Sequence, residues 1–442
     1  MNWRKKAIAG WKKPWLHNGM KHLEKQFSTI ASAEHEPQSL KNLRNSAFDS
    51  FKKTGFPKKN WEAWRFTTVA DLVKTPFRLS TEADLPEVIS KSLDNLPFPT
   101  LLFVNGHYQP DESTLPKGIN VNTLIDSYNE DAKLVTNGFD SGSSPFTVLN
   151  TAMMNSGLHI RISEDFENHT PIRFLYLTTK LSEPIMNHPR LILDMADNAQ
   201  ANIIEEYRGD SSDSYWNNAV TVIRTGNNSK VHHVRIQNEA PAASHLATTI
   251  YEVGAKGAIH GCFISAGAAL YRNDVNVTLL GEGADVTLNG LCLSRETQHM
   301  DHNITVDHTS EHVTSRMLFK YILAEKSSAV FNGRAVVRSD AQKTDADQTN
   351  KNLLLGNDAL MYSNPQLEIY ADDVRCTHGS STGQISEDAL FYLRSRGLDA
   401  VSAKALLING FANEVVDDIN NEEIRDYTRR LFESWLSGVT HG

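Results

Sequence analysis

Residues 248–291 read TTIYEVGAKGAIHGCFISAGAALYRNDVNVTLLGEGADVTLNGL, and this stretch decides the fold. Short runs rich in β-branched residues alternate here with turns that contain Gly, Asn or Asp; the clearest runs are Thr248–Val253, Asp274–Leu280 and Asp285–Leu291. No amphipathic segment of helix length separates these runs, which disfavours alternating βαβ units. The stretch therefore predicts consecutive strands.

The same pattern extends from about Phe146 to Tyr370. Further strand-like runs are Arg190–Met195, Ala219–Arg224 and Lys230–Gln237. Turn clusters recur at a spacing of roughly 27–30 residues: Asp197-Asn198, Asn227-Asn228, Ala255-Lys256-Gly257 and Glu282-Gly283. A repeat of this length indicates a solenoid, either a β-helix or a pair of stacked sheets. A β-sandwich is the alternative. Because a stacked repeat needs capping, helical domains are expected to close both ends.

Helical periodicity brackets this β region. Apolar residues recur at helical spacing over Ser39–Phe56, before Gly55 and Pro57 end the helix. After Gly383 three helices are expected: one capped by Ser386 or Asp388 and ending at Gly397, one following Asp399, and one from about Glu422. We therefore predict a helix-rich domain over 1–144, a β-helix core over 145–383 and a helical domain over 384–442.

Composition narrows the functional class. The chain has 442 residues, 40% hydrophobic and 22% charged, as in ordinary globular proteins. Its net charge of −9 argues against nucleic acid as the main partner. No apolar run approaches the ~18 residues of a membrane span, so no membrane partner is expected. Three cysteines, without a CxxC, disfavour a disulfide framework and fit a reducing cytoplasmic setting.

The first two dozen residues are basic and carry several tryptophans. No acidic residue precedes Glu24, and no Ser precedes Ser28, although transit peptides are rich in Ser. Pro14 would interrupt a helix through this stretch. We expect a basic, amphipathic segment that is retained in the mature protein.

No nucleotide-binding loop of the P-loop type is present. Gly379–Gly383 lacks the Lys of a Walker A motif, and no helix is expected after Gly281–Gly283. We therefore expect this chain to bind no nucleotide.

Several histidines and cysteines are candidate metal ligands by residue type. His299, His302, His308 and His312 do not have the spacing of a helical metal site, and in a strand residues i and i+3 face opposite sides. They are interpreted as residues of strand surfaces and turns. Cys262 and Cys292 lie about one repeat apart, so they are predicted to stack in the core on adjacent turns.

The sharpest chemical feature is Cys376-Thr377-His378. If Val374–His378 is the last strand, the two-residue period places Cys376 and His378 on one face. A thiolate beside an imidazole suits a soft metal or an iron–sulfur cluster. Two ligands cannot complete a four-ligand site, so a partner must supply the others, or the two residues are structural.

Three segments carry a resemblance to a known family. Thr344–Leu355 followed by Pro365–Gly379 (PQLEIYADDVRCTHG) closely resembles the signature of the SufB/SufD family of iron–sulfur cluster assembly scaffolds. Glu62–Thr67 (EAWRFT) looks like the family's N-terminal motif. Phe391–Gly397 with Leu407–Phe411 looks like its C-terminal motif. The resemblance covers nearly the whole chain.

The branch of the family follows from two positions. SufB-like chains carry a Cys near the position of Asn350 and a Glu where Gly379 stands, so the chain resembles the SufD branch. The resemblance implies a right-handed parallel β-helix flanked by helical domains. It also implies a non-catalytic subunit that pairs with SufB and, through its C-terminal helices, with the ATPase SufC.

The resemblance implies cofactor chemistry as well. A transient iron–sulfur cluster would be assembled at the SufB–SufD interface, with His378 and, as its helper, Cys376 contributing from this chain. A homodimer is a further expectation for the isolated chain.

Two alternative functions remain open. One is a β-helix polysaccharide lyase or hydrolase that uses Asp345 and Asp347, and the other is a self-sufficient metal protein, which the cysteine count disfavours.

Overall fold

The computed structural model describes residues 14–31, 36–80, 98–116, 118–130, 144–166, 170–179, 183–209 and 213–440. Residues 1–13, which hold much of the basic N-terminal segment, lie outside them.

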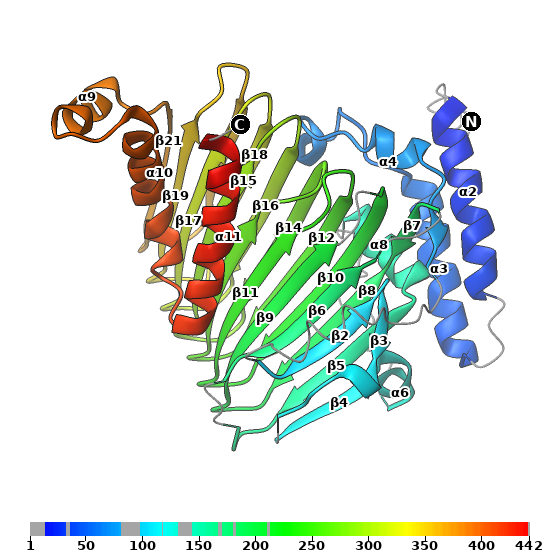
Figure 1. The fold of residues 1–442 in the computed structure, drawn as a ribbon. Helices are drawn as coiled ribbons and strands as arrows, with labels where there is room; N and C mark the ends of the chain where they lie inside the picture. The colour runs from blue at the N-terminus through cyan, green and yellow to red at the C-terminus, as the bar shows by residue number, and fades with distance from the viewer. Residues whose placement is uncertain are drawn as a thin grey trace, which may run out of the picture.

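Two large sheets dominate the molecule (Figure 1). Sheet A contains β1 (Arg78–Leu79), β4 (Ile119–Thr123), β5 (Ser156–Ile162), β7 (Ile185–Asn187), β8 (Pro189–Met195), β10 (Tyr215–Thr225), β12 (Ser244–Val253), β14 (Leu270–Leu279), β16 (His299–His308), β18 (Ser328–Val337) and β20 (Leu360–Ile369). Sheet B contains β2 (Thr100–Val104), β3 (His107–Gln109), β6 (Ile172–Thr178), β9 (Gln200–Gly209), β11 (Lys230–Asn238), β13 (Ala258–Ser265), β15 (Asp285–Ser294), β17 (Thr314–Leu323), β19 (Asp345–Leu354) and β21 (Arg375–Gly383).

From β8 onward the chain alternates between the two sheets. Each strand pairs in parallel with the strand two positions later, as in β10 with β12 and β11 with β13. Consecutive strands therefore make one turn of a solenoid, and the next turn stacks on it. This is the predicted parallel β-helix. The strand-like runs named from the sequence lie within longer strands of the structure, except that Leu280 lies one residue past the end of β14.

The predicted turn clusters fix the repeat. Asn198, Asn228, Lys256 and Gly283 all have positive φ, between 53° and 71°. Each turn also bonds to the next one: the N–H of Asn198 donates to the carbonyl of Asn227 (2.8 Å), and that of Asn228 to Ala255 (2.9 Å). Asn and Gly tolerate this left-handed conformation best, which explains their recurrence in the sequence. Lys256 shows that stacking can impose it on another residue.

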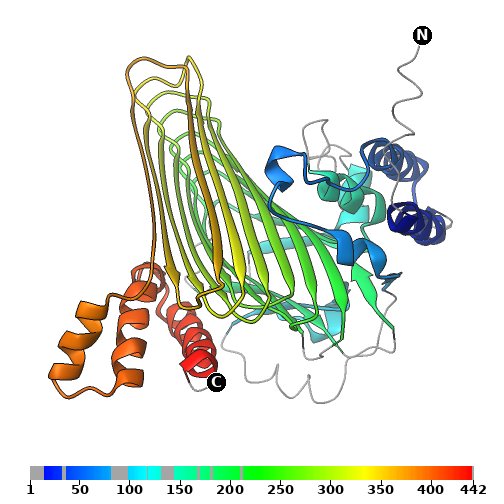
Figure 2. The same ribbon diagram turned by 90° about the horizontal axis from the view of Figure 1, so that it is seen from above.

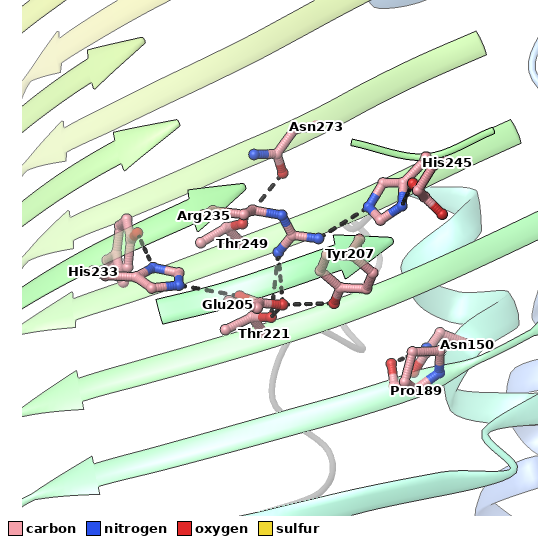
Figure 3. A network of polar contacts seen from close by, with 12 residues as sticks. Asn150, Pro189, Glu205, Tyr207, Thr221, His233, Arg235, His245, Thr249 and Asn273 are labelled. Carbon is pink, nitrogen blue, oxygen red and sulfur yellow. Dashed lines mark hydrogen bonds and ion pairs between the residues drawn. The ribbon is translucent and has the colours of Figure 1, made fainter. Parts of the chain in front are cut away.

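Side chains fill the space between the sheets. Most are apolar, and aromatic rings stack from turn to turn, as Tyr176 does on Tyr207 at 4.5 Å between centroids. A buried polar network interrupts them (Figure 3). At its centre the Arg235 guanidinium donates to Glu205 (3.0 Å), whose carboxylate also accepts from Tyr207 (2.6 Å) and Thr221 (2.7 Å). A buried charge pair needs such additional hydrogen bonds to offset the loss of water.

The N-terminal helices lie along the outer face of sheet A. They are α2 (Pro14–Ala31), α3 (Gln38–Thr54), α4 (Ala70–Lys74) and α8 (Pro145–Met153), with the short α6 (Leu124–Glu130) beside β4 and β5. Helix α3 ends at Gly55 (φ 71°), as predicted. Helix α8 falls where the sequence pattern indicated the start of the β region. Every residue of α8 is buried, so it lacks the one-sided apolar pattern by which a surface helix is recognised.

The three C-terminal helices confirm the expected segments. They are α9 (Glu387–Ser395), α10 (Ala400–Val416) and α11 (Glu422–Thr440). The Ser386 hydroxyl caps α9 by accepting from the Ala389 N–H, and Asp399 caps α10. Helices α10 and α11 pack their apolar faces on the outer face of sheet B, opposite the N-terminal helices (Figure 2). None of the described helices combines the length and the apolar character that crossing a bilayer requires.

The predicted N- and C-terminal helices flank the β-helix, but they lie along its sides and not across its ends. At the first end, β3 and β4 run antiparallel to their neighbours β2 and β5 and so finish the sheets with strands. At the last end, the helices lie beside sheet B instead of across the final turn. Helices α10 and α11 are amphipathic, and they bury the apolar outer face of sheet B, which would otherwise be exposed to water.

Candidate functional site

The last turn of the β-helix, formed by β20 and β21, is open. Each of these strands is the final member of its sheet, and no described element pairs with its outer edge. Nearly all their residues are exposed or half-buried, whereas the preceding strands are mostly buried. Unpaired N–H and C=O groups along such an edge form a template for another chain.

The structure places Cys376 and His378 side by side on this open turn. In β21 they pair in register with Ala346 and Gln348 of β19. Both face the interior side of the sheet, since Cys376 packs on the small cluster that contains Val337. Thr377, between them, points the other way and donates its hydroxyl to Asp347. The predicted common face is confirmed; the role as ligands stays a prediction.

The two side chains differ in accessibility. His378 is exposed, and Cys376 is half-buried. Partial burial raises the pKa of the Cys376 thiol, and the nearby Asp345 carboxylate raises it further. The thiol is therefore protonated at neutral pH in the isolated chain. A metal ion removes the proton when it coordinates sulfur.

A polar cluster lies next to them at the mouth of the interior. The side-chain oxygen of Asn350 accepts from Asn352 (2.7 Å) and Ser363 (2.8 Å), and Ser380 lies 2.7 Å from Ser363. These contacts join β19 in sheet B to β20 in sheet A. Asn350, singled out in the sequence for the branch of the family, therefore stands at the centre of the open end.

The other histidines do not gather around a metal. His302 is buried between the sheets, where its ring contacts the Tyr321 hydroxyl at 2.9 Å. Burial lowers the pKa of His302 to about 3, and Arg235 and Arg272 contribute. His308 is buried as well, so these two are core residues and not surface residues as interpreted. Within the described ranges, no three His, Cys, Asp or Glu side chains meet as a metal site would require.

The prediction for Cys262 and Cys292 is half right. Both are buried and lie on the neighbouring strands β13 and β15. They do not stack, because Cys262 pairs with Asn289 and Cys292 pairs with Ser265, three residues away. In strands this offset places them on opposite faces. Burial raises the pKa of Cys262 to about 12 and also raises that of Cys292, so neither is a thiolate at neutral pH.

The sequence did not reveal the position of the motif Glu62–Thr67, which we call the N-terminal strap. Trp64 covers the buried Arg272 guanidinium of β14 at 3.9 Å, and Thr67 donates to Asp301 of β16. Phe66 stacks on Tyr362 of β20, with ring centroids 4.0 Å apart. The strap thus crosses the outer face of sheet A and reaches its last strand. Only the fold could show this, because β20 lies roughly 300 residues further along the chain.

A second exposed surface lies on the C-terminal helices. Helix α9 has no buried residue, although it carries aromatic side chains. We call the exposed apolar residues there the α9–α10 patch: Phe391 (75% exposed), Tyr392 (57%), Leu398 (37%), Val401 (44%) and Leu406 (51%). Several large apolar residues exposed on neighbouring segments in this way are typical of a protein-binding surface.

Comparison with known proteins agrees with the resemblance drawn from the motifs. Residues 176–411 match the model of the SufBD core domain of the SUF system for FeS cluster assembly, and residues 20–174 match that of the SufBD N-terminal region. The iron–sulfur cluster assembly SufBD family protein slr0076 of Synechocystis is 32% identical over 87% of this chain and 88% of its own length. The iron–sulfur cluster assembly protein SufD of Escherichia coli is 28% identical, over 89% and 91%. The chloroplastic protein ABCI7 of Arabidopsis thaliana is 29% identical, over 98% and 93%. Because the core model matches more than half of the chain and the Synechocystis relative is 32% identical over most of it, the chain belongs to the SufBD family of iron–sulfur cluster assembly proteins.

Proposed function

We propose that this chain is a non-catalytic scaffold subunit that pairs through its open turn with a SufB-type chain and assembles nascent clusters at that junction. The observation that carries the proposal is the position of Cys376 and His378. They share the interior face of the last strand of sheet B, where the edge is unpaired. A second β-helix that continued both sheets from this edge would cover Cys376 and His378 and would bring its own ligands close to them.

The ligand count explains why a partner is needed. An iron–sulfur cluster is held by about four protein ligands, and this chain offers a thiol and an imidazole. The Asn350 cluster beside them contains amides and hydroxyls, which are weak ligands for iron but good hydrogen-bond partners for sulfide. The cluster is cargo of the assembly and not a resident cofactor of this chain.

We assign the α9–α10 patch to the ATPase SufC. The chain lacks a P-loop of its own, so the energy of nucleotide hydrolysis must come from another subunit. Helix α9 projects away from sheet B (Figure 2), and the apolar residues of the patch are exposed to solvent. The three free cysteines favour a cytoplasmic location, where thiols stay reduced. Without SufB, two copies would pair through the same open turn as a homodimer.

Co-purification tests the proposal. The chain should be isolated alone, and also with SufB- and SufC-type partners, under anaerobic conditions, and iron and acid-labile sulfide measured in each sample. We expect iron and sulfide in the complex and almost none in the chain alone. Stoichiometric cluster in the isolated chain would instead identify a self-sufficient iron–sulfur protein. Cleavage of a polysaccharide by the isolated chain would identify the lyase alternative.

A further inference from the structure

Among the described residues, Gln348 is a buried amide without a hydrogen-bond partner, on the strand next to the open turn. It lies in β19 directly in register with His378, and its side chain is on the same interior face of sheet B. The residue is 1% exposed, and neither its amide oxygen nor its amide nitrogen hydrogen-bonds to a described residue. A buried polar group left unpaired destabilises the folded state, so its presence calls for an explanation.

The fold makes room for this amide. Gly333 of β18, in the facing sheet, has no side chain where the Gln348 amide lies, and a Cβ there would come within 2.4 Å of the Gln348 oxygen. The ring of Phe331 closes the same space, 2.7 Å from that Cβ position. Packing thus holds the amide across the interior, one turn behind the open edge. An apolar residue of this size would fill the same space without leaving polar groups unpaired.

We propose that Gln348 is a positioning residue for His378. The amide oxygen accepts the N–H of one ring nitrogen, which fixes the tautomer and leaves the lone pair of the other nitrogen for iron. Histidine ligands are commonly oriented by such a second hydrogen bond. The ring of His378 is exposed on an edge strand, so rotating it toward its register neighbour meets little packing resistance. This inference rests on the proposed function of His378.

The first test measures the tautomer directly. The full chain is labelled with 15N-histidine, and the His378 signals are assigned by their loss in His378→Gln. We expect Gln348→Met, which keeps the volume but removes the acceptor, to shift both ring nitrogens toward the values of a freely exchanging histidine. Gln348→Glu, which keeps an acceptor oxygen, should preserve a single dominant tautomer. Asn273→Leu, which removes another buried unpaired amide nitrogen in β14, is the control and should change nothing at His378.

The second test uses the complex with SufB and SufC. Removing a partner that orients a metal ligand typically costs about 10–100-fold in metal affinity, so Gln348→Met should retain about tenfold less iron under chelator challenge. If His378→Gln loses iron while Gln348→Met does not, and the ring shifts are unchanged, the inference fails and the proposed function stands. If neither variant loses iron, the proposed role of His378 fails as well.

Discussion

Glu205 illustrates how single residues sustain a polar interior. Burial by itself raises the pKa of this carboxyl, but Arg235, with His233 and Tyr207, outweighs it and holds the pKa at about 2. In the unfolded chain the value is about 4.3. Between these values the unfolded state binds more protons than the folded state. The Glu205 contribution to stability is therefore complete above about pH 4.5 and is lost as the pH falls toward 2.

This gives a pH prediction. The free energy of unfolding from urea titrations should decrease steadily below about pH 4.5, and Glu205→Gln should flatten that part of the profile while lowering stability at pH 7. The exposed Glu282→Gln is the matched control and should leave the profile unchanged. An identical acid profile in Glu205→Gln and the unmodified chain would show that Glu205 is not held ionised by Arg235.

Cys292 gives a second prediction at this scale. Its thiol is 1% exposed in the apolar core, away from the open turn. Cys292→Ala should lower the free energy of unfolding by about 1 kcal/mol, because it removes a small buried volume. Cluster content of the complex should stay normal. Loss of cluster from a fully stable variant would mean that Cys292 is a ligand.

Residue alternation explains how much of the site the sequence could predict. The two-residue period of a strand sufficed to place Cys376 and His378 on one face. The contacts of Gln348 could not be predicted, because its neighbour lies thirty residues further along the chain and the exact register was unknown. The same uncertainty of register produced the wrong stacking of Cys262 on Cys292.

Among the elements, the N-terminal strap has a specific expected role. Phe66 braces β20 by stacking on Tyr362, and such pairs contribute about 0.5–1.5 kcal/mol. Phe66→Ala should speed hydrogen exchange of the β20 amides without affecting β10, and should weaken association with SufB several-fold. The exposed Leu115→Ala is the control. Unchanged exchange in β20 would show that the strap does not support the open turn.

The α9–α10 patch is tested by surface substitution. Helices α10 and α11 bury apolar residues against sheet B, so deleting 386–436 would uncover part of that face. Phe391→Asp with Tyr392→Asp avoids this, because both side chains are exposed. We expect the double variant to fold normally and to lose SufC in pull-down experiments while it keeps SufB. Leu280→Asp, also exposed, should retain both. Retention of SufC by the double variant would place the ATPase elsewhere.

The elements that the sequence predicted share one property: each has a solvent-exposed face or a capping residue that leaves a visible pattern in the sequence. The strands stood out through their turns, and α9 and α10 through Ser386 and Asp399. Helix α8 was missed because it is buried on all sides, so tertiary packing and not amphipathicity determines it.

For the whole molecule, the main result is a β-helix with one finished and one open end. The repeat length predicted the solenoid, but it carries no information on how the stack stops, because capping depends on elements outside the repeat. The helices that were expected to close the stack cover its sides instead (Figure 1). The open turn ends in two strands whose outer edges no described element of this chain pairs with, and Cys376 and His378 lie on one of these strands.

The most direct test of this account is the cluster content of the complex with His378→Ala. Because His378 is exposed, the substitution should leave the fold intact, and we expect SufB and SufC to stay bound because the proposed contacts extend well beyond this one side chain. We predict a clear fall in iron and acid-labile sulfide per complex, with a similar but smaller fall in Cys376→Ser. Normal cluster content in an intact His378→Ala complex would contradict the account.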